Sequence, residues 1–140
     1  MENSGGQARC PFKATIMTQQ FGCEHAESIT RREGPDIACG SSSANGGCVT
    51  LFENLKQSAL PDMGYNDDLL SMPASVLQKI QFGGLLALQE LVTGSKQEER
   101  VENIIELVKQ ATEKYGEVGA IPVQLCNQRI SDYKLKKRRR

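Results

Sequence analysis

The clearest pattern of hydrophobic and polar positions in the chain lies between residues 95 and 116. Its apolar side chains recur at steps of three and four residues, which places them on one face of a helix: Val101, Ile104, Ile105 and Val108. Ser95 and Glu98 form a capping-box pattern at the start of this segment. Gly116 can adopt the left-handed conformation that ends many helices. The segment therefore predicts one amphipathic helix that ends near Tyr115.

Two further helices are predicted in the middle of the chain. A second stripe at helical spacing begins at Cys48 and stops at Pro61, with these members: Cys48, Leu51, Phe52, Leu55 and Ala59. The Leu-rich stretch 76–92 also favours a helix, but it contains the pair Gly83-Gly84. Two glycines cost roughly 2 kcal/mol relative to alanine inside a helix. The pair therefore marks a kink, a close packing point or a break between two helices.

The remaining segments have shorter and weaker patterns. A strand is predicted over residues 12–16, where apolar side chains alternate with others: Phe12, Ala14 and Ile16. Residues 23–33 favour a helix over a strand, and residues 36–39 a short strand. The Ser-, Gly- and Asn-rich stretch 40–47 predicts a loop. Residues 120–130 contain a proline that excludes a central strand, which leaves an edge segment or a short helix.

These elements together predict an α+β, helix-rich fold. A cysteine-bearing N-terminal half with little strand content packs on a C-terminal helical part. We expect a disordered lead over residues 1–9, a single domain over 10–130 and a basic tail over 131–140. Within the domain, residues 10–60 carry the cysteines and residues 72–116 supply the helices.

Composition and charge restrict the core and the partners. Only 39% of the 140 residues are apolar and there is no Trp, so a bound metal would usefully supplement a modest core. The formal net charge is zero, but six of the 17 basic residues lie in the run 134–140. The rest of the chain is therefore about −6, with 11 basic and 17 acidic residues. We expect nucleic-acid binding only through the tail, whereas the acidic body suits a protein redox partner with a basic surface.

The N-terminus is polar and Gly-rich, without the apolar core of a signal peptide. The longest apolar stretch, around residues 83–88, is too short to span a bilayer. These features predict a cytoplasmic protein without a membrane span. Disulfides are rare in such a reducing compartment, so another reason is needed for the clustering of cysteines near the N-terminus.

Four of the five cysteines fall within the first 48 residues: Cys10, Cys23, Cys39 and Cys48. Their spacing matches none of the C-x₂-C motifs of zinc sites or bacterial ferredoxins. However, Cys10 precedes a proline, and the other three adjoin glycines where the backbone can turn and offer amides to sulfur. The predicted helix start at Cys48 would also favour a thiolate. We therefore predict that these four cysteines bind an iron–sulfur cluster, with [4Fe-4S] favoured over [2Fe-2S].

This prediction implies electron transfer, redox sensing or cluster assembly within a larger redox system. The partner would be a redox protein or a larger enzyme complex, and a homo-oligomer is a further option. A self-sufficient enzyme is not expected, because no substrate-activating group accompanies the cysteines. A nucleophilic Cys23 paired with His25 is disfavoured, since the chain has no other histidine to serve as an independent base.

Two alternatives remain open. The first is a zinc-stabilised interaction module without catalytic activity, in which the only histidine, His25, could complete a tetrahedral site with cysteines. The second is a metal-free helical adaptor whose cysteines only pack in the core. Cys126, between Leu125 and Asn127, is interpreted as such a core thiol.

Overall fold

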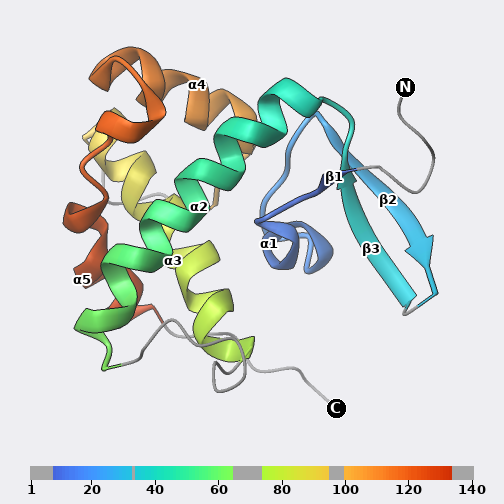
Figure 1. Cartoon of the computed structure of the whole chain (residues 1–140), viewed down its shortest axis with the longest axis horizontal. Coiled ribbons are helices and arrows are strands. Elements are labelled where there is room, and N and C mark those ends of the chain that lie inside the picture. The colour runs from blue at the N-terminus through green and yellow to red at the C-terminus, as the bar shows by residue number, and fades with distance from the viewer. Residues whose placement is uncertain (1–7, 33, 65–73, 95–99, 134–140) are drawn as a thin grey trace.

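The computed structural model of the chain describes residues 8–32, 34–64, 74–94 and 100–133. The fold is α+β and helix-rich, as predicted (Figure 1). Its elements follow in this order: β1 (Ala8–Arg9), α1 (Lys13–Met17), β2 (Ala26–Arg31), β3 (Gly34–Cys39), α2 (Ser42–Asp62), α3 (Ala74–Thr93), α4 (Ile104–Tyr115), the 3₁₀ turns η2 (Val118–Ala120) and η3 (Val123–Cys126), and α5 (Asn127–Asp132). None of the described helices is long and apolar enough to cross a membrane.

A small antiparallel sheet stands at one end of the molecule, beside the helices (Figure 1). Its strand order is β1-β3-β2, so β3 is central and pairs with both neighbours. Helix α1 contacts both β3 and α3, and therefore links the sheet to the helices. Helix α2 extends from the sheet to α5 and contacts both.

Two predicted elements near the first cysteines were wrong. Residues 12–16, predicted as a strand, belong largely to α1, because the amide and hydroxyl of Thr15 both donate to the Phe12 carbonyl, at 3.1 and 2.7 Å. Phe12 and Thr15 are both fully buried, and their three-residue spacing fits a helical turn. In the predicted helix over 23–33, residues 26–31 instead form β2, which pairs with β3 along its whole length. The predicted strand at 36–39 is confirmed as part of β3.

Helix α2 begins earlier than predicted. The loop expected over residues 40–47 is wrong from Ser42 onward, because Ser41 caps the helix by accepting a hydrogen bond from the Ala44 amide at 3.2 Å. Cys48 therefore lies in the second turn of α2 instead of at its start. The helix passes Pro61 and ends at Asp62.

Helix α3 is continuous through its glycine pair, which is a close packing point. A Cβ atom at Gly83 would lie 2.7 Å from the Cα atom of Ile130 in α5, and one at Gly84 would lie 2.9 Å from a methyl carbon of Leu55 in α2. The glycines therefore allow α3 to approach both neighbouring helices closely. The predicted kink or break is absent from this described helix.

Helix α4 ends at Tyr115, as predicted, and Gly116 follows with a φ of +97°. The described helix begins at Ile104, and the predicted capping box at residues 95–98 lies outside the described residues. The ambiguous segment 120–130 forms 3₁₀ turns and the start of α5, which agrees with the short-helix alternative.

Both ends of the domain also differ from the predicted boundaries. Ala8 and Arg9, placed in the disordered lead, form β1. Helix α5 extends to Asp132, and Tyr133 is buried and stacks on Phe82 at a ring distance of 5.3 Å. The basic tail predicted over 131–140 therefore contains three residues that pack with the domain, and residues 134–140 lie outside the described part of the chain.

Candidate metal centre

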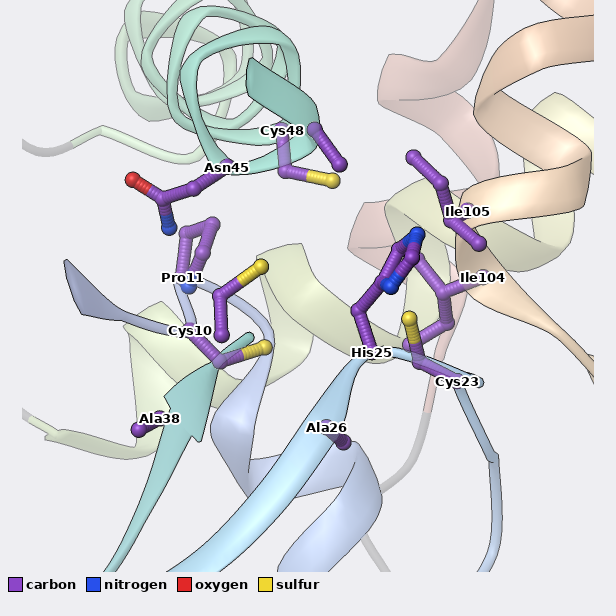
Figure 2. A pocket seen from close by; sticks show the side chains of 12 residues that line it. Cys10, Pro11, Cys23, His25, Ala26, Ala38, Asn45, Cys48, Ile104 and Ile105 are labelled. Atoms are coloured by element: carbon purple, nitrogen blue, oxygen red, sulfur yellow. The ribbon is translucent and has the colours of Figure 1, made fainter. Parts of the chain in front are cut away.

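The structure brings the four N-terminal cysteines to one pocket. Cys10, Cys23, Cys39 and Cys48 all line it, together with His25. The cavity among these side chains is small, with about 10 Å³ open to the centre of a water-sized molecule. In Figure 2 the side chains of Cys10, Cys23 and Cys48 extend toward the space between them. Four segments that are well separated in the sequence therefore present thiols to a common volume.

The sheet positions two of these cysteines. Cys10 directly follows β1 and donates its amide to the Ile37 carbonyl on β3 at 3.1 Å. Cys39 is the last residue of β3, and the next amide, that of Gly40, donates to the His25 carbonyl at 2.8 Å. The Cys39 thiol itself donates to the Ser41 carbonyl at 3.2 Å. Pairing of β1 and β2 on either side of β3 therefore places the two thiols at the same end of the sheet.

The segment that carries Cys23 is held by residues just before α4. Gly22 donates its amide to the Val101 carbonyl at 3.0 Å and accepts from the Ile104 amide at 2.7 Å. A Cβ atom at Gly22 would lie 2.9 Å from the Glu102 carbonyl oxygen, so a side chain there would separate the two segments. Glycine is needed at this position because of the close backbone approach.

Asn103 makes a second pair of bonds across the same junction. Its side-chain oxygen accepts from the Glu24 amide at 3.1 Å, and its side-chain nitrogen donates to the Glu24 carboxylate at 2.8 Å. We call the contacts of Gly22 and Glu24 with residues 101–104 the α4 clamp. Asn103 has no signal in the sequence, because its partner is 79 residues away and no local pattern connects them.

Helix α2 supplies Cys48 and is tied to β1. The Asn45 side chain donates to the Arg9 carbonyl at 2.9 Å, next to Cys10 in the chain. Cys48 lies one turn further along the helix and is only 7% exposed. Because Asn45 lies about one turn before Cys48, its bond to Arg9 also holds Cys48 beside the pocket.

Burial suppresses ionisation of two of the thiols. Desolvation, with a smaller contribution from the charges of the other three cysteines, raises the pKa of Cys48 to about 12. Desolvation also raises the pKa of Cys10 to about 11, although a hydrogen bond from the Phe12 amide to its sulfur opposes the effect. The predicted helix-dipole activation of Cys48 is therefore wrong. Both groups are neutral thiols at pH 7 unless a cation stabilises the thiolates.

A group of charged side chains holds the strands beside the pocket. Asp36 on β3 is 4% exposed and has three cationic neighbours, Arg31 at 2.5 Å, Lys13 at 3.4 Å and Arg9 at 3.8 Å. Desolvation acts to raise the pKa of Asp36, but bonds from the Ile37 amide, Arg31 and Lys13 outweigh it and hold the pKa below its usual value. Because Arg9 and Lys13 lie on either side of Cys10, these ion pairs help to fix that cysteine against β3.

His25 lines the same pocket, and the sequence had left its role open. Its side chain is 30% exposed, and its Nε2 atom lies 3.7 Å from a carboxylate oxygen of Glu24. The position of His25 two residues after Cys23 was the only sequence signal for this proximity. Cys126, in contrast, is fully buried and is not part of the pocket, which confirms its interpretation as a core thiol.

The thiols surround the pocket without converging on one point. Among the residues that the structure describes, no three His, Cys, Asp or Glu side chains are close enough to hold a single metal ion. Comparison with known proteins finds no matching family model, no matching curated protein and no matching solved structure. The functional argument therefore depends on the chemistry and the arrangement of the residues themselves.

Proposed function

We propose that the protein binds an iron–sulfur cluster through Cys10, Cys23, Cys39 and Cys48. Its role would be electron transfer, redox sensing or cluster assembly within a larger redox system. The observation that carries this proposal is that four thiols from four separate segments line one pocket. When bound, such a cluster supplies one-electron chemistry, whereas the protein supplies the ligands and their surroundings.

The surroundings of the thiols support a cationic occupant. Burial raises the pKa values of Cys10 and Cys48, as it raises that of the core thiol Cys126, and bound iron would stabilise the thiolates of the pocket. The amide of Phe12 already points at the Cys10 sulfur. Hydrogen bonds from amides to sulfur are a common feature of iron–sulfur sites and tune their potentials.

The spread of the thiols favours a cluster over a single ion. A tetrahedral zinc site with Zn–S bonds of about 2.3 Å brings its sulfurs within about 3.8 Å of one another. A cluster distributes its protein ligands over several iron atoms, so its thiolates can lie farther apart. Four thiols around a pocket supply one ligand for each iron of a [4Fe-4S] cluster, which we favour over [2Fe-2S].

A zinc-stabilised interaction module is the second candidate, and His25 is the observation that supports it. Three cysteines and a histidine form a common structural zinc set, and His25 faces the same pocket as the thiols. Zinc would then stabilise the cysteine-bearing end while the helices contact a partner. The metal-free adaptor is the remaining alternative and predicts that neither metal binds.

The proposed setting is a reducing compartment such as the cytoplasm, because the ligands must remain free of disulfides. All five cysteines are unpaired in the structure. A cluster protein of this size would act with a protein redox partner or within an enzyme complex, since no catalytic group other than the cysteines and His25 lines the described pocket.

The first experiment is anaerobic purification, followed by a visible spectrum and determination of iron, acid-labile sulfide and zinc. We expect a brown protein with iron and sulfide in equal amounts. A colourless protein with one zinc per chain would replace this proposal with the zinc module. A protein that takes up neither metal after reconstitution with iron and sulfide would leave only the adaptor.

Single-cysteine variants then test the ligands. Cys10→Ala and Cys39→Ala should lose the cluster, because each removes a thiolate that has no nearby substitute among the described pocket residues. Cys126→Ala is the matched control: it removes a buried thiol of the same chain outside the pocket and should keep the wild-type iron content. Retention of the cluster by Cys39→Ala would refute the ligand assignment.

A further inference from the structure

The pocket contains one more donor than a four-ligand site needs. We propose that His25 is a second ligand for the metal position that Cys23 serves. The site would then hold its cofactor through Cys10, Cys39, Cys48 and either Cys23 or His25. This inference rests on the proposed function, and the experiment below separates a failure of one from a failure of the other.

Both donors come from the same short segment and reach the same pocket. Cys23 and His25 are two residues apart in a turn, which the Ala26 amide closes by donating to the Cys23 carbonyl at 3.1 Å. His25 is the last residue before β2, and both side chains line the pocket. In Figure 2 the His25 ring extends into the space between Cys23 and Cys48. Either side chain can therefore bind a metal atom on the same side of a bound cofactor.

The imidazole is available for ligation. Its Nε2 atom lies 3.7 Å from Glu24, which is too long for a hydrogen bond, and within the described part of the chain the ring has no other polar contact. Two of the thiols are engaged, because the Cys39 sulfur donates to the Ser41 carbonyl and the Cys10 sulfur accepts from the Phe12 amide. Imidazole nitrogen is a proven substitute for thiolate on iron in iron–sulfur centres, where it raises the reduction potential.

The backbone of this segment stays fixed whichever donor binds. The α4 clamp holds Gly22 and Glu24 on either side of Cys23, and the Gly40 amide holds the His25 carbonyl. An exchange between the two ligands therefore needs only side-chain rotation. Rotation of one side chain is far faster than rearrangement of the fold.

A neighbouring groove gives this position access to solvent. The groove lies between the start of α2 and α4, has a volume of about 630 Å³, and shares His25, Ala44 and Ile105 with the cysteine pocket. His25 thus forms part of the wall between the two. When Cys23 is the ligand, the imidazole can turn toward the groove, and a small external donor can enter from that side.

The test compares the iron content of full-length variants reconstituted anaerobically with iron and sulfide. Cys23→Ala should keep the cluster with a changed visible spectrum, and its reduced form should show nitrogen hyperfine coupling that shifts when histidine is labelled with ¹⁵N. Cys23→Ala/His25→Ala should lose iron at least about 10-fold relative to Cys23→Ala. His25→Ala alone should keep the wild-type iron content, because all four thiols remain.

Cys10→Ala is the matched control, since no spare donor stands beside Cys10, and it should lose the cluster. Imidazole added to the solution should enter through the groove and restore iron binding to Cys23→Ala/His25→Ala. Circular dichroism checks that each variant is folded. If Cys23→Ala does not fold, Cys23→Ser replaces it, and the nitrogen coupling still identifies the ligand.

Loss of iron by folded Cys23→Ala to the same degree as by Cys10→Ala would overturn the inference and leave the cluster proposal intact. A wild-type chain that binds zinc instead of iron would refute the proposed function, and the same series read as zinc content would then decide the role of His25. A wild-type chain that binds neither metal would overturn both.

Discussion

The helical part and the cysteine-bearing end of this molecule are held together in different ways. In the helical part, the contact is direct and apolar: a Cβ atom at Gly83 would lie 2.7 Å from the Cα atom of Ile130, and Leu85 and Leu88 are fully buried. Such packing leaves little room for adjustment. Its stabilisation comes from the removal of apolar surface from water and needs no ligand.

The cysteine-bearing end depends on polar contacts between distant segments. The α4 clamp holds the Cys23 segment, and Asp36 attracts the cations on either side of Cys10. The thiols line a small pocket, and Cys48, Cys10 and Cys23 also contact the edge of the apolar core. The helical part is therefore expected to be stable without a ligand, whereas the proposed cofactor, if bound, would add contacts at the cysteine-bearing end.

Removal of the proposed cofactor should separate the two regions most clearly. With a chelator present, we expect hydrogen exchange at the amides of Gly22, Glu24 and Gly40 to accelerate, on the order of 100-fold if the cofactor had been at 100 times its dissociation constant. The amides of Leu85 and Leu88 should change much less. Mass spectrometry of exchanged peptides measures both regions in one sample, and equal acceleration in both would contradict the comparison.

Gly83→Ala should lower the stability of the helical part. The new methyl group would collide with the backbone of Ile130, so we expect a loss of about 2 kcal/mol in unfolding free energy by urea denaturation. Gly46→Ala is the control, because that helical glycine of α2 has no atom within 4 Å of its Cβ position. It should stabilise the protein by up to about 1 kcal/mol. Equal effects of the two substitutions would refute the close-packing account.

Asn103→Ala tests the α4 clamp. It removes both hydrogen bonds to Glu24, so we expect a loss of about 1 kcal/mol in stability and weaker metal binding in a competition assay. Gln110→Ala, on the same helix, removes a 3.4 Å contact with Glu106 that does not reach the pocket. That variant should keep the wild-type metal affinity, and an equal loss in both variants would argue against a specific role of the clamp.

The smallest effect is expected in the pH dependence that Asp36 contributes. Its pKa is lowered in the folded protein, so its stabilisation is complete above the unfolded value of about 3.9 and is lost as the pH falls toward the lowered value. Two of its three cationic partners are largely exposed, which weakens their effect. Asp36→Asn should therefore flatten the acid limb of the stability curve. Chemical denaturation between pH 3 and 7 measures it, and an unchanged slope would count against the ion-pair group.

The two regions also differed in how far the sequence could predict them. The apolar face of α4 and the end of this helix before Gly116 were predictable, because a long helix repeats its buried positions several times. The segments 12–16 and 23–33 were assigned to the wrong element, because five to ten residues carry too few repeats to separate the two periods. The bonds of Thr15 to the Phe12 carbonyl decided the first, and the hairpin pairing of β2 with β3 decided the second.

The candidate site was predicted better than the elements that build it. The four clustered cysteines indicated a common site, and the structure places them around one pocket, although the residues near Cys10, Cys23 and Cys48 fold differently from the prediction. Asn103 carried no signal of its own, since a single polar residue before a helix predicts a cap and not a distant partner.

The α4 clamp also has a consequence for how the protein is made. The Glu24 segment leaves the ribosome 79 residues before its partner Asn103, an interval of roughly 4–16 s at a synthesis rate of about 5–20 residues per second. During that interval Cys10, Cys39 and Cys48 can already emerge while the Cys23 segment lacks its contacts with residues 101–104. If the proposed cofactor binds, we therefore expect the nascent chain to retain it only after the start of α4 has been synthesised.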